Sequence, residues 1–172
     1  MFKVGELIIY SAHGICQIDD ICEKTYFDIT KKYYVLHPLD NLKLSISTPV
    51  DNKAVAMLEL LEQDEAKIIL NSFHSPGIEW IEDNKQRTKT YSDIINSGNR
   101  KELSKVVNTL LRKKYEAELD NKKLLDQDLK LLISVQNILY RELAYSLNTS
   151  FESIMDEISN SIHSNLKVPS TV

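Results

Sequence analysis

The chain has little of the material that builds catalytic or cofactor sites. It contains only four glycines, four prolines and two cysteines in 172 residues. No GxxxxGK(S/T), GxGxxG or GxSxG motif occurs, and so few glycines leave little scope for a loop that cradles phosphate. We therefore expect no catalytic residues, no enzymatic activity and no cofactor.

Metal ligands are equally sparse. Cys16 and Cys22 match no zinc spacing, and the four histidines are scattered along the chain. His13 and Cys16 form an HxxC pair, but no second pair completes a tetrahedral site. We expect no metal site and two reduced thiols. A small enzyme that uses His13 and Cys16 is a rival hypothesis, which a shared pocket for the two side chains would support.

Long apolar runs are missing too. No stretch of about 18 apolar residues occurs, and the N-terminus lacks the basic-then-apolar layout of a signal peptide. Hydrophobic residues make up 42% of the chain and charged residues 27%, values that are typical of globular proteins. We expect a folded cytoplasmic protein.

Charge is low overall but unevenly placed. The net charge of −4 argues against a protein that coats DNA through bulk positive charge. Residues 85–123 nevertheless carry eleven Lys or Arg and five acidic residues, whereas residues 59–83 carry seven acidic residues and Lys67 alone. Any contact with nucleic acid is therefore local, and we expect it to be weak without a partner.

The pattern of residues 1–52 is that of β-strands. Residues 7–10, 15–18 and 32–37 are rich in β-forming residues, and residues 41–47 alternate apolar and polar positions. Turns are expected around Gly14, which can adopt a positive φ, and between Pro38 and Asn41. So few short strands favour a small, strongly curved barrel of the SH3 or Tudor type.

From residue 53 onward the pattern becomes helical, so we place a domain boundary there and expect an α+β fold with about five helices. Residues 52–73 have helical periodicity, and residues 92–97 form a short helical turn that Gly98 ends. Asn99, Asp120 and Thr149 are expected to cap the three helices that follow, Thr149 in a capping box with Glu152.

Trp80 is the only tryptophan in the chain. It can be a core residue, because so large a ring is normally at least partly buried. Its polar neighbours and the nearby Lys85, Arg87 and Lys89 favour a second interpretation, an exposed minor-groove wedge flanked by cations that hold phosphates. A further basic run, Arg112-Lys113-Lys114, ends an expected helix, where it can stabilise the helix dipole or contact DNA.

Several short motifs together resemble the CarD/CdnL family of bacterial RNA polymerase-binding regulators, whose N-terminal module is similar to the polymerase-interacting domain of the transcription-repair coupling factor. The similarity extends over nearly the whole chain. The matching residues are Phe2-Lys3-Val4-Gly5-Glu6, Ile9-Tyr10, His13-Gly14, Tyr33-Tyr34-Val35-Leu36, Thr48-Pro49, Trp80, Gly98-Asn99, Val106-Val107, Arg112-Lys113, Ile138-Leu139 and Glu142-Leu143-Ala144.

This resemblance implies a Tudor-like domain over residues 1–52 that binds the polymerase β subunit, and a helical domain over residues 53–172 that meets promoter DNA at the upstream edge of the transcription bubble. The protein would then reach the nucleoid through RNA polymerase. The polymerase contacts it implies are Lys24, Lys43, Ile46 and Ser47, where Ser47 stands at a position that is commonly basic in relatives.

The DNA contacts are expected at Trp80 as the wedge and at Lys85, Arg87, Lys89, Arg112, Lys113 and Lys114. In relatives several basic residues directly follow the tryptophan, whereas this chain has Ile81-Glu82-Asp83-Asn84 there, so its DNA affinity is expected to be lower. The alternative is a protein–protein adaptor, in which the helical domain binds another protein and Trp80 anchors that interface.

Overall fold

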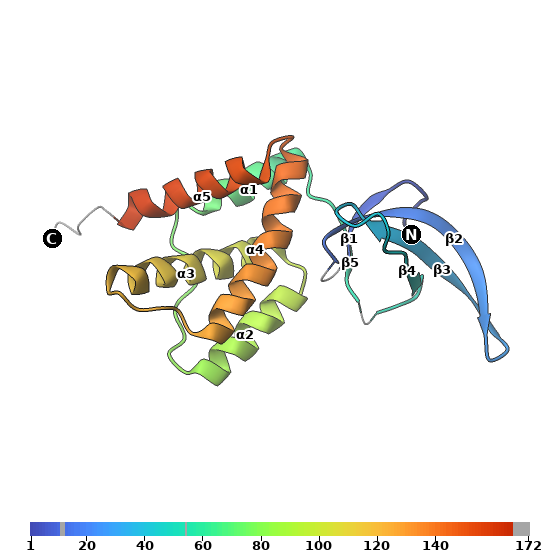
Figure 1. The fold of residues 1–172 in the computed structure, drawn as a ribbon, viewed down its shortest axis with the longest axis horizontal. Coiled ribbons are helices and arrows are strands. Elements are labelled where there is room, and N and C mark those ends of the chain that lie inside the picture. The colour runs from blue at the N-terminus through green and yellow to red at the C-terminus, as the bar shows by residue number, and fades with distance from the viewer. Residues whose placement is uncertain (11–12, 54, 167–172) are drawn as a thin grey trace. The chain divides into compact units, whose positions relative to one another are not determined.

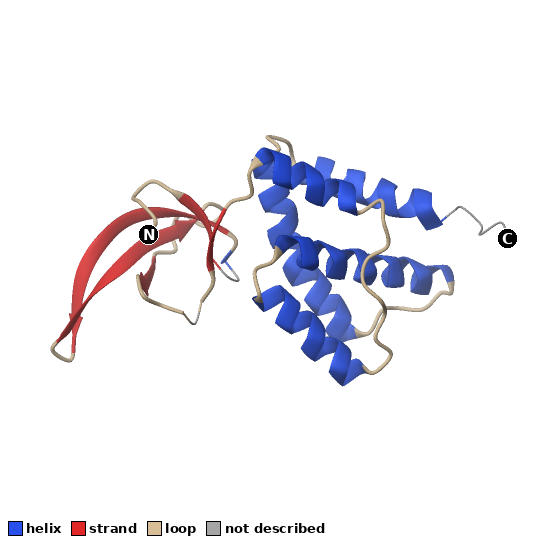
Figure 2. Cartoon of the chain, turned by 180° about the vertical axis from the view of Figure 1, so that it is seen from behind, coloured by secondary structure: helices blue, strands red, loops and turns tan. Residues whose placement is uncertain are grey.

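The computed structural model describes residues 1–10, 13–53 and 55–166. The chain divides into two compact units, Met1–Leu60 and Leu61–Val172. The first contains the β-strands and the second contains the helices (Figures 1 and 2). The β-then-α order expected from the sequence is confirmed. None of the helices in the described ranges is both long and apolar enough to cross a membrane.

The N-terminal unit is a five-stranded antiparallel sheet with the strand order β4-β3-β2-β1-β5. Its strands are β1 (Leu7–Tyr10), β2 (Ile15–Tyr26), β3 (Ile29–Pro38), β4 (Ile46–Pro49) and β5 (Met57–Glu59). The sheet is open, because β4 and β5 form its two edges and do not pair with each other in the part of the chain that the structure describes. The expected closure into a barrel is therefore wrong.

One face of this sheet holds the core of the unit. Its fully buried residues include Ile8, Cys16, Ile18 and Leu36. A β-bulge between Ile18 and Asp20 shifts the register, so that Ile18 and Ile21 both face this core although they are three positions apart. In a strand without a bulge, strict alternation would place side chains three positions apart on opposite faces.

Two predictions about this region fail in part, one because of local turns and the other because pairing between distant strands overrides the local pattern. Residues 41–47 alternate like a strand, but two consecutive turns closed by the amides of Asn41 and Leu44 leave only the segment from Ile46 in β4. Residues 52–73 were expected to be helical throughout, but Met57–Glu59 pairs with β1 as β5. Because β5 belongs to the sheet, the boundary between the units follows Leu60.

The second unit contains the helices α1 (Gln63–Ser72), α2 (Asn84–Asn96), α3 (Arg100–Leu119), α4 (Asp126–Ser146) and α5 (Phe151–Leu166). α3 contacts each of the other four helices, and α4 contacts α1, α2, α3 and α5. The apolar residues predicted for these helices form one core, among them Val106, Leu110, Leu139 and Ile158, all fully buried. α3 and α4 therefore organise the unit (Figure 1).

The observed helix caps match the capping residues predicted from the sequence only in part. Asn99 caps α3 as predicted, since its side chain accepts hydrogen bonds from the amides of Lys101 and Glu102. Asp120 instead ends α3, and α4 begins at Asp126 without a side-chain cap. At α5 the cap is Ser150 rather than Thr149, because the hydroxyl of Ser150 accepts from the amide of Ser153.

Candidate functional site

Trp80 lies in the segment of residues 73–83 that joins α1 to α2, and side chains of α2 and α3 bind the backbone of that segment. Asn108 donates to the carbonyl of Ser75 at 2.7 Å, and Thr109 donates to that of Ile78 at 2.8 Å. Arg87 donates to the carbonyls of Ile81 and Glu82 at 2.7 and 3.2 Å. The loop therefore has a defined path, although it contains no regular secondary structure.

Gly77 is required for the close approach of this loop to α3. A Cβ atom at this position would collide with the hydroxyl of Thr109, the carbonyl of Lys105 and the amide of Thr109. Two of these three are backbone atoms of a packed helix, which cannot move aside. The Ser75-Pro76-Gly77 break that the sequence indicated is thus a site of tight packing as well as a helix stop.

Trp80 itself is half-buried and packs against the core of the helical unit. The guanidinium carbon of Arg87 lies over the ring at 4.1 Å from its centroid, and Nζ of Lys113 lies at 5.6 Å. The ring therefore contributes to the core and is also partly exposed. The contacts fix an indole beside two cations.

Arg87 has a different role from the one expected. Its side chain is 1% exposed, and its guanidinium forms a bidentate pair with Asp128 at 3.1 and 2.6 Å. The remaining donors are taken by the carbonyls of Ile81 and Glu82 and by the side chain of Asn84. All five N–H donors of the group are thus occupied. Arg87 is not available to a phosphate, and it is removed from the set of DNA contacts.

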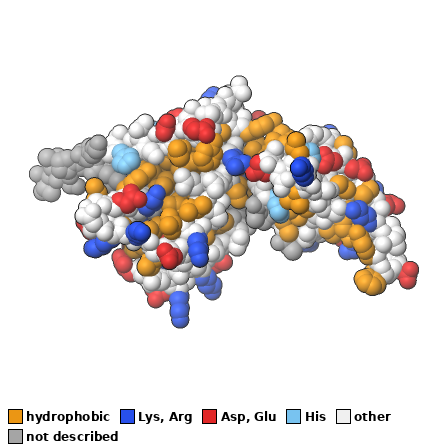
Figure 3. Space-filling view, in the orientation of Figure 1, with side chains coloured by type: hydrophobic (Ala, Val, Ile, Leu, Met, Phe, Trp, Pro, Cys, Tyr) orange, Lys and Arg blue, Asp and Glu red, His pale blue; other side chains and the backbone are white. Residues whose placement is uncertain are grey.

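The other basic residues differ in whether they form ion pairs within the protein. Lys85 and Lys89 lie on α2, are exposed, and have no ion pair within the described ranges. Lys113 and Lys114 pair with Glu116 and Glu118 of the same helix at 2.8 and 3.8 Å. In the view of Figure 3, Lys and Arg atoms gather along the lower edge of the helical unit, where Figure 1 places α2.

Arg112 is partly committed to the structure of the loop. Its Nε donates to Asn108 at 2.7 Å, and its Nη2 reaches the carbonyls of Phe73 and Ser75 at 3.3 Å. Burial lowers the pKa of this guanidinium. Arg112 therefore helps to fix the start of the Trp80 loop, and any contact it makes with DNA would be additional to that role.

Sequence reasoning did not single out Gly77, Asn108, Thr109 or Asp128 as functional residues. Asp128 is 41 positions from Arg87, and in the sequence it is one acid among several near the start of α4. Only the packing of α2 against α4 brings the two together. Gly77, in a helix-breaking segment, was the one local signal in the sequence for the structure of this loop.

The residues expected to bind polymerase lie at and near the β4 edge of the sheet. Ile46 and Ser47 are in β4, and Lys43 is exposed in the preceding turns. Lys24 lies on β2, and its Nζ reaches across β3 to the hydroxyl of Ser47 at 2.7 Å. Ile46 contributes partly to the core, whereas Ser47 is exposed. Three of the four positions therefore offer polar groups at one edge.

His13 and Cys16 do not form a joint site. His13 is exposed and stacks on Tyr10 with ring centroids 5.9 Å apart, while Cys16 is fully buried. Burial raises the pKa of the Cys16 thiol to about 11, so it is protonated at neutral pH and a poor nucleophile. Over the described ranges, no three His, Cys, Asp or Glu side chains are grouped as metal ligands.

Comparisons with known proteins agree with this two-part architecture. The CarD-like/TRCF RID domain matches residues 2–59, and the CarD C-terminal domain matches residues 68–159. The Bacillus subtilis (strain 168) protein named "Putative transcription factor YdeB" is 31% identical over 139 residues, which cover 78% of this chain and 89% of YdeB. Both units are thus matched, each by its own domain, and the chain belongs to the CarD-like family.

Proposed function

We propose that this CarD-like protein is a transcription regulator that binds the β subunit of RNA polymerase through its N-terminal unit and stabilises the promoter open complex through its helical unit. Trp80 acts at the upstream edge of the bubble, supported by Lys85, Lys89, Lys113 and Lys114. The observation that carries the proposal is the half-buried indole fixed beside cations on the surface of the helical unit.

The β4 edge supports the polymerase contact. An edge strand presents unpaired backbone N–H and C=O groups, which can extend the sheet of a partner protein by one strand. β4 pairs with β3 on one side and with no other strand in the described part of the sheet. Lys24, Lys43 and Ser47 supply polar contacts beside it, so this edge can bind both the backbone and the side chains of a partner.

The geometry around Trp80 supports the contact with melted DNA. Apolar wedges inserted into the minor groove unstack a base step, while nearby cations hold the phosphates. A wedge has to resist the stacking energy of DNA, which favours a side chain that is already fixed. Packing against the helical core and the guanidinium of Arg87 hold the ring in this way.

Weak affinity for DNA is compatible with this function. Binding to polymerase makes the encounter of the helical unit with promoter DNA intramolecular, at an effective concentration of about a millimolar for short flexible linkers. The regulator only has to bind the open state better than the closed state. A difference of about 1.4 kcal/mol changes the ratio of open to closed complexes about tenfold.

Replacing Trp80 by Ala tests this proposal. The Trp80→Ala chain is expected to bind polymerase normally and to shorten the lifetime of the open complex about tenfold relative to the unmodified chain, for a lost stabilisation of about 1.4 kcal/mol. The measurement is the dissociation rate of promoter complexes challenged with competitor DNA. Tyr145→Ala is a matched control, because it removes another exposed aromatic ring of the helical unit. An unchanged lifetime with Trp80→Ala would remove the wedge from the mechanism.

The Trp80→Ala variant also distinguishes DNA binding from the adaptor alternative. That alternative is favoured by the ion pairs of Lys105, Lys113 and Lys114 with neighbouring acids, because these pairs leave less free positive charge for phosphates. If Trp80 anchors a protein interface, Trp80→Ala weakens capture of that protein in the absence of DNA. A DNA contact instead makes the effect on the open complex fall steeply with added salt.

A further inference from the structure

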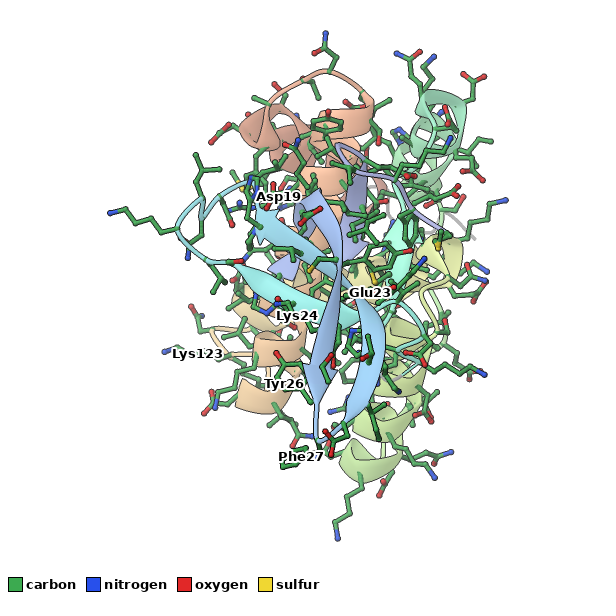
Figure 4. The ribbon with its side chains drawn as sticks, turned by 90° about the vertical axis from the view of Figure 1, so that its right-hand side faces the viewer. Asp19, Glu23, Lys24, Tyr26, Phe27 and Lys123 are labelled. Carbon is green, nitrogen blue, oxygen red and sulfur yellow. The ribbon has the colours of Figure 1, made fainter. Side chains whose placement is uncertain are left out.

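The hairpin of β2 and β3 extends well beyond the rest of the sheet. β1 pairs with β2 only up to Gln17, and β4 pairs with β3 only as far out as Tyr33. Beyond these points the two strands pair with each other alone, ending at Tyr26 and Ile29. Figure 4 shows Tyr26 and Phe27 at the free end of this arm.

The end of the arm is apolar and exposed. Tyr26 is 54% exposed, Phe27 98% and Ile29 61%, and these three residues are called the apolar tip below. Hydrophobic atoms are visible at this end in Figure 3. Isolated exposed apolar residues are ordinary, but three at the tip of one projecting hairpin form an apolar patch whose exposure to water is unfavourable.

The turn at this tip is also unfavourable for Phe27. Phe27 and Asp28 have φ values of 49° and 60°, so both central residues of the two-residue loop are left-handed. Such type I′ turns favour Asn-Gly, because a residue with a bulky side chain is strained at positive φ. The hairpin thus displays a phenylalanine where neither the backbone nor the solvent favours one, which is typical of a residue kept for binding.

Side-chain contacts connect the apolar tip to the β4 edge along one face. The ring of Tyr26 meets that of Tyr33 edge-on, with centroids 5.8 Å apart. Nζ of Lys24 lies over the Tyr33 ring at 5.8 Å and bonds to Ser47 of β4 at 2.7 Å. Tyr26, Tyr33, Lys24 and Ser47 therefore form a continuous surface from the tip to the strand edge.

We propose that the apolar tip is a second anchor for the protein that binds the β4 edge, and that Phe27 inserts into an apolar pocket on that partner. The inference rests on the proposed function, which makes this partner RNA polymerase. A partner seated along the β4 edge would lie over the continuous surface that ends at the tip. Aromatic side chains that enter a pocket are the residues that most often dominate protein interfaces.

The double variant Phe27→Asn, Asp28→Gly tests this inference in the full-length chain. Asn-Gly is the preferred sequence of a type I′ turn, so the midpoint of thermal unfolding should stay the same or rise. The affinity for purified polymerase core, measured by titration, should nevertheless fall about tenfold or more, as expected for the loss of an aromatic anchor. Higher stability with weaker binding is a result that a structural role of Phe27 would not produce.

Leu119→Asn is the matched control, since Leu119 is an exposed apolar residue of the helical unit, 79% exposed. This variant should bind polymerase as the unmodified chain does. Unchanged affinity of the double variant, or weaker affinity together with a lower unfolding midpoint, overturns the inference alone. If the unmodified chain fails to bind polymerase, both the proposed function and this inference are overturned.

Two other occupants of the tip would also overturn the proposal. Sedimentation of the unmodified chain as a dimer, and of the double variant as a monomer, would assign the tip to a second copy of the chain. Binding of the unmodified chain to phosphatidylcholine vesicles, lost in the double variant, would assign it to a lipid surface.

Discussion

At the scale of single residues, Cys16 and Cys22 lie on the same strand in different environments. Cys16 faces the core of the sheet and is fully buried, and burial raises the pKa of its thiol to about 11. Cys22 pairs with Tyr33 on the other face and is half-buried. Both thiols are free. Only the thiolate reacts with electrophiles, so the two cysteines should differ in accessibility and the buried one should be unreactive.

Limited alkylation should therefore modify one cysteine in the folded chain. With iodoacetamide at pH 8 we expect Cys22 to react and Cys16 to stay protected, because the protein does not expose or ionise the Cys16 thiol at that pH. Peptide mass spectrometry identifies the modified residue. In denaturant both should react, which serves as the control. Equal labelling of the two cysteines in the native chain would contradict the burial of Cys16.

At the scale of elements, the Trp80 loop depends on a buried pair between two helices. Arg87 of α2 and Asp128 of α4 are both 1% exposed, and Arg87 also holds two carbonyls that directly follow Trp80 in the chain. A second, partly buried pair, Arg100 with Glu142, lies between α3 and α4, and Glu142 also accepts from the amide of Leu61. The two pairs are chemically alike, but only the first contacts Trp80.

Asp128→Asn should consequently loosen Trp80. Removing one partner of a buried ion pair leaves an uncompensated charge, and we expect the free energy of unfolding to fall by about 3–5 kcal/mol. Trp80 is the only tryptophan, so its fluorescence reports this site alone. Its emission should shift to longer wavelength, and acrylamide should quench it more strongly. Glu142→Gln should lower stability without changing the emission, and a similar shift in both variants would argue against a positioning role of Arg87.

The distance along the chain between interacting residues explains which features the sequence could predict. Asn99 was identified as a cap because its partners lie two and three residues away. β5 was missed because its partner β1 is about fifty positions distant, and pairing there overrides the local helical pattern. Of the cations expected near Trp80, Arg87 lies over the ring, but its burial depends on Asp128, 41 positions on. Local chemistry is readable from sequence, whereas burial and partner choice depend on tertiary packing.

At the scale of the whole molecule, a chain with a net charge of −4 would have to make the proposed DNA contact through a few cations. Each phosphate contact lowers the logarithm of the binding constant by about 0.9 per tenfold increase in salt. Four Lys residues, at positions 85, 89, 113 and 114, are the proposed contacts. For these four contacts, the logarithm of the effect on open complexes should fall with the logarithm of the salt concentration with a slope no steeper than about −3.6.

Removing two of these cations should change that slope by a countable amount. We expect the combined variant Lys85→Ala, Lys89→Ala to reduce its magnitude by about 2, because each lysine that contacts a phosphate accounts for about one unit. The measurement is open-complex lifetime over a series of salt concentrations with saturating protein. Lys3→Ala, an exposed lysine of the N-terminal unit, should leave the slope unchanged. An unaltered slope in the double variant would exclude α2 from the DNA contact.

The bulge at Asp19 determines which side chains of the long hairpin point outward. Asp19, labelled in Figure 4, is the extra residue on β2. Its carboxylate contacts Nδ1 of His37 at 2.8 Å. If the strand instead alternated strictly through Asp19, its outer half would be inverted, with Lys24 turned toward the core side and Ile21 toward water. Natural changes in arm length should therefore occur in even steps on each strand, which preserve sidedness while changing the distance between the tip and the β4 edge.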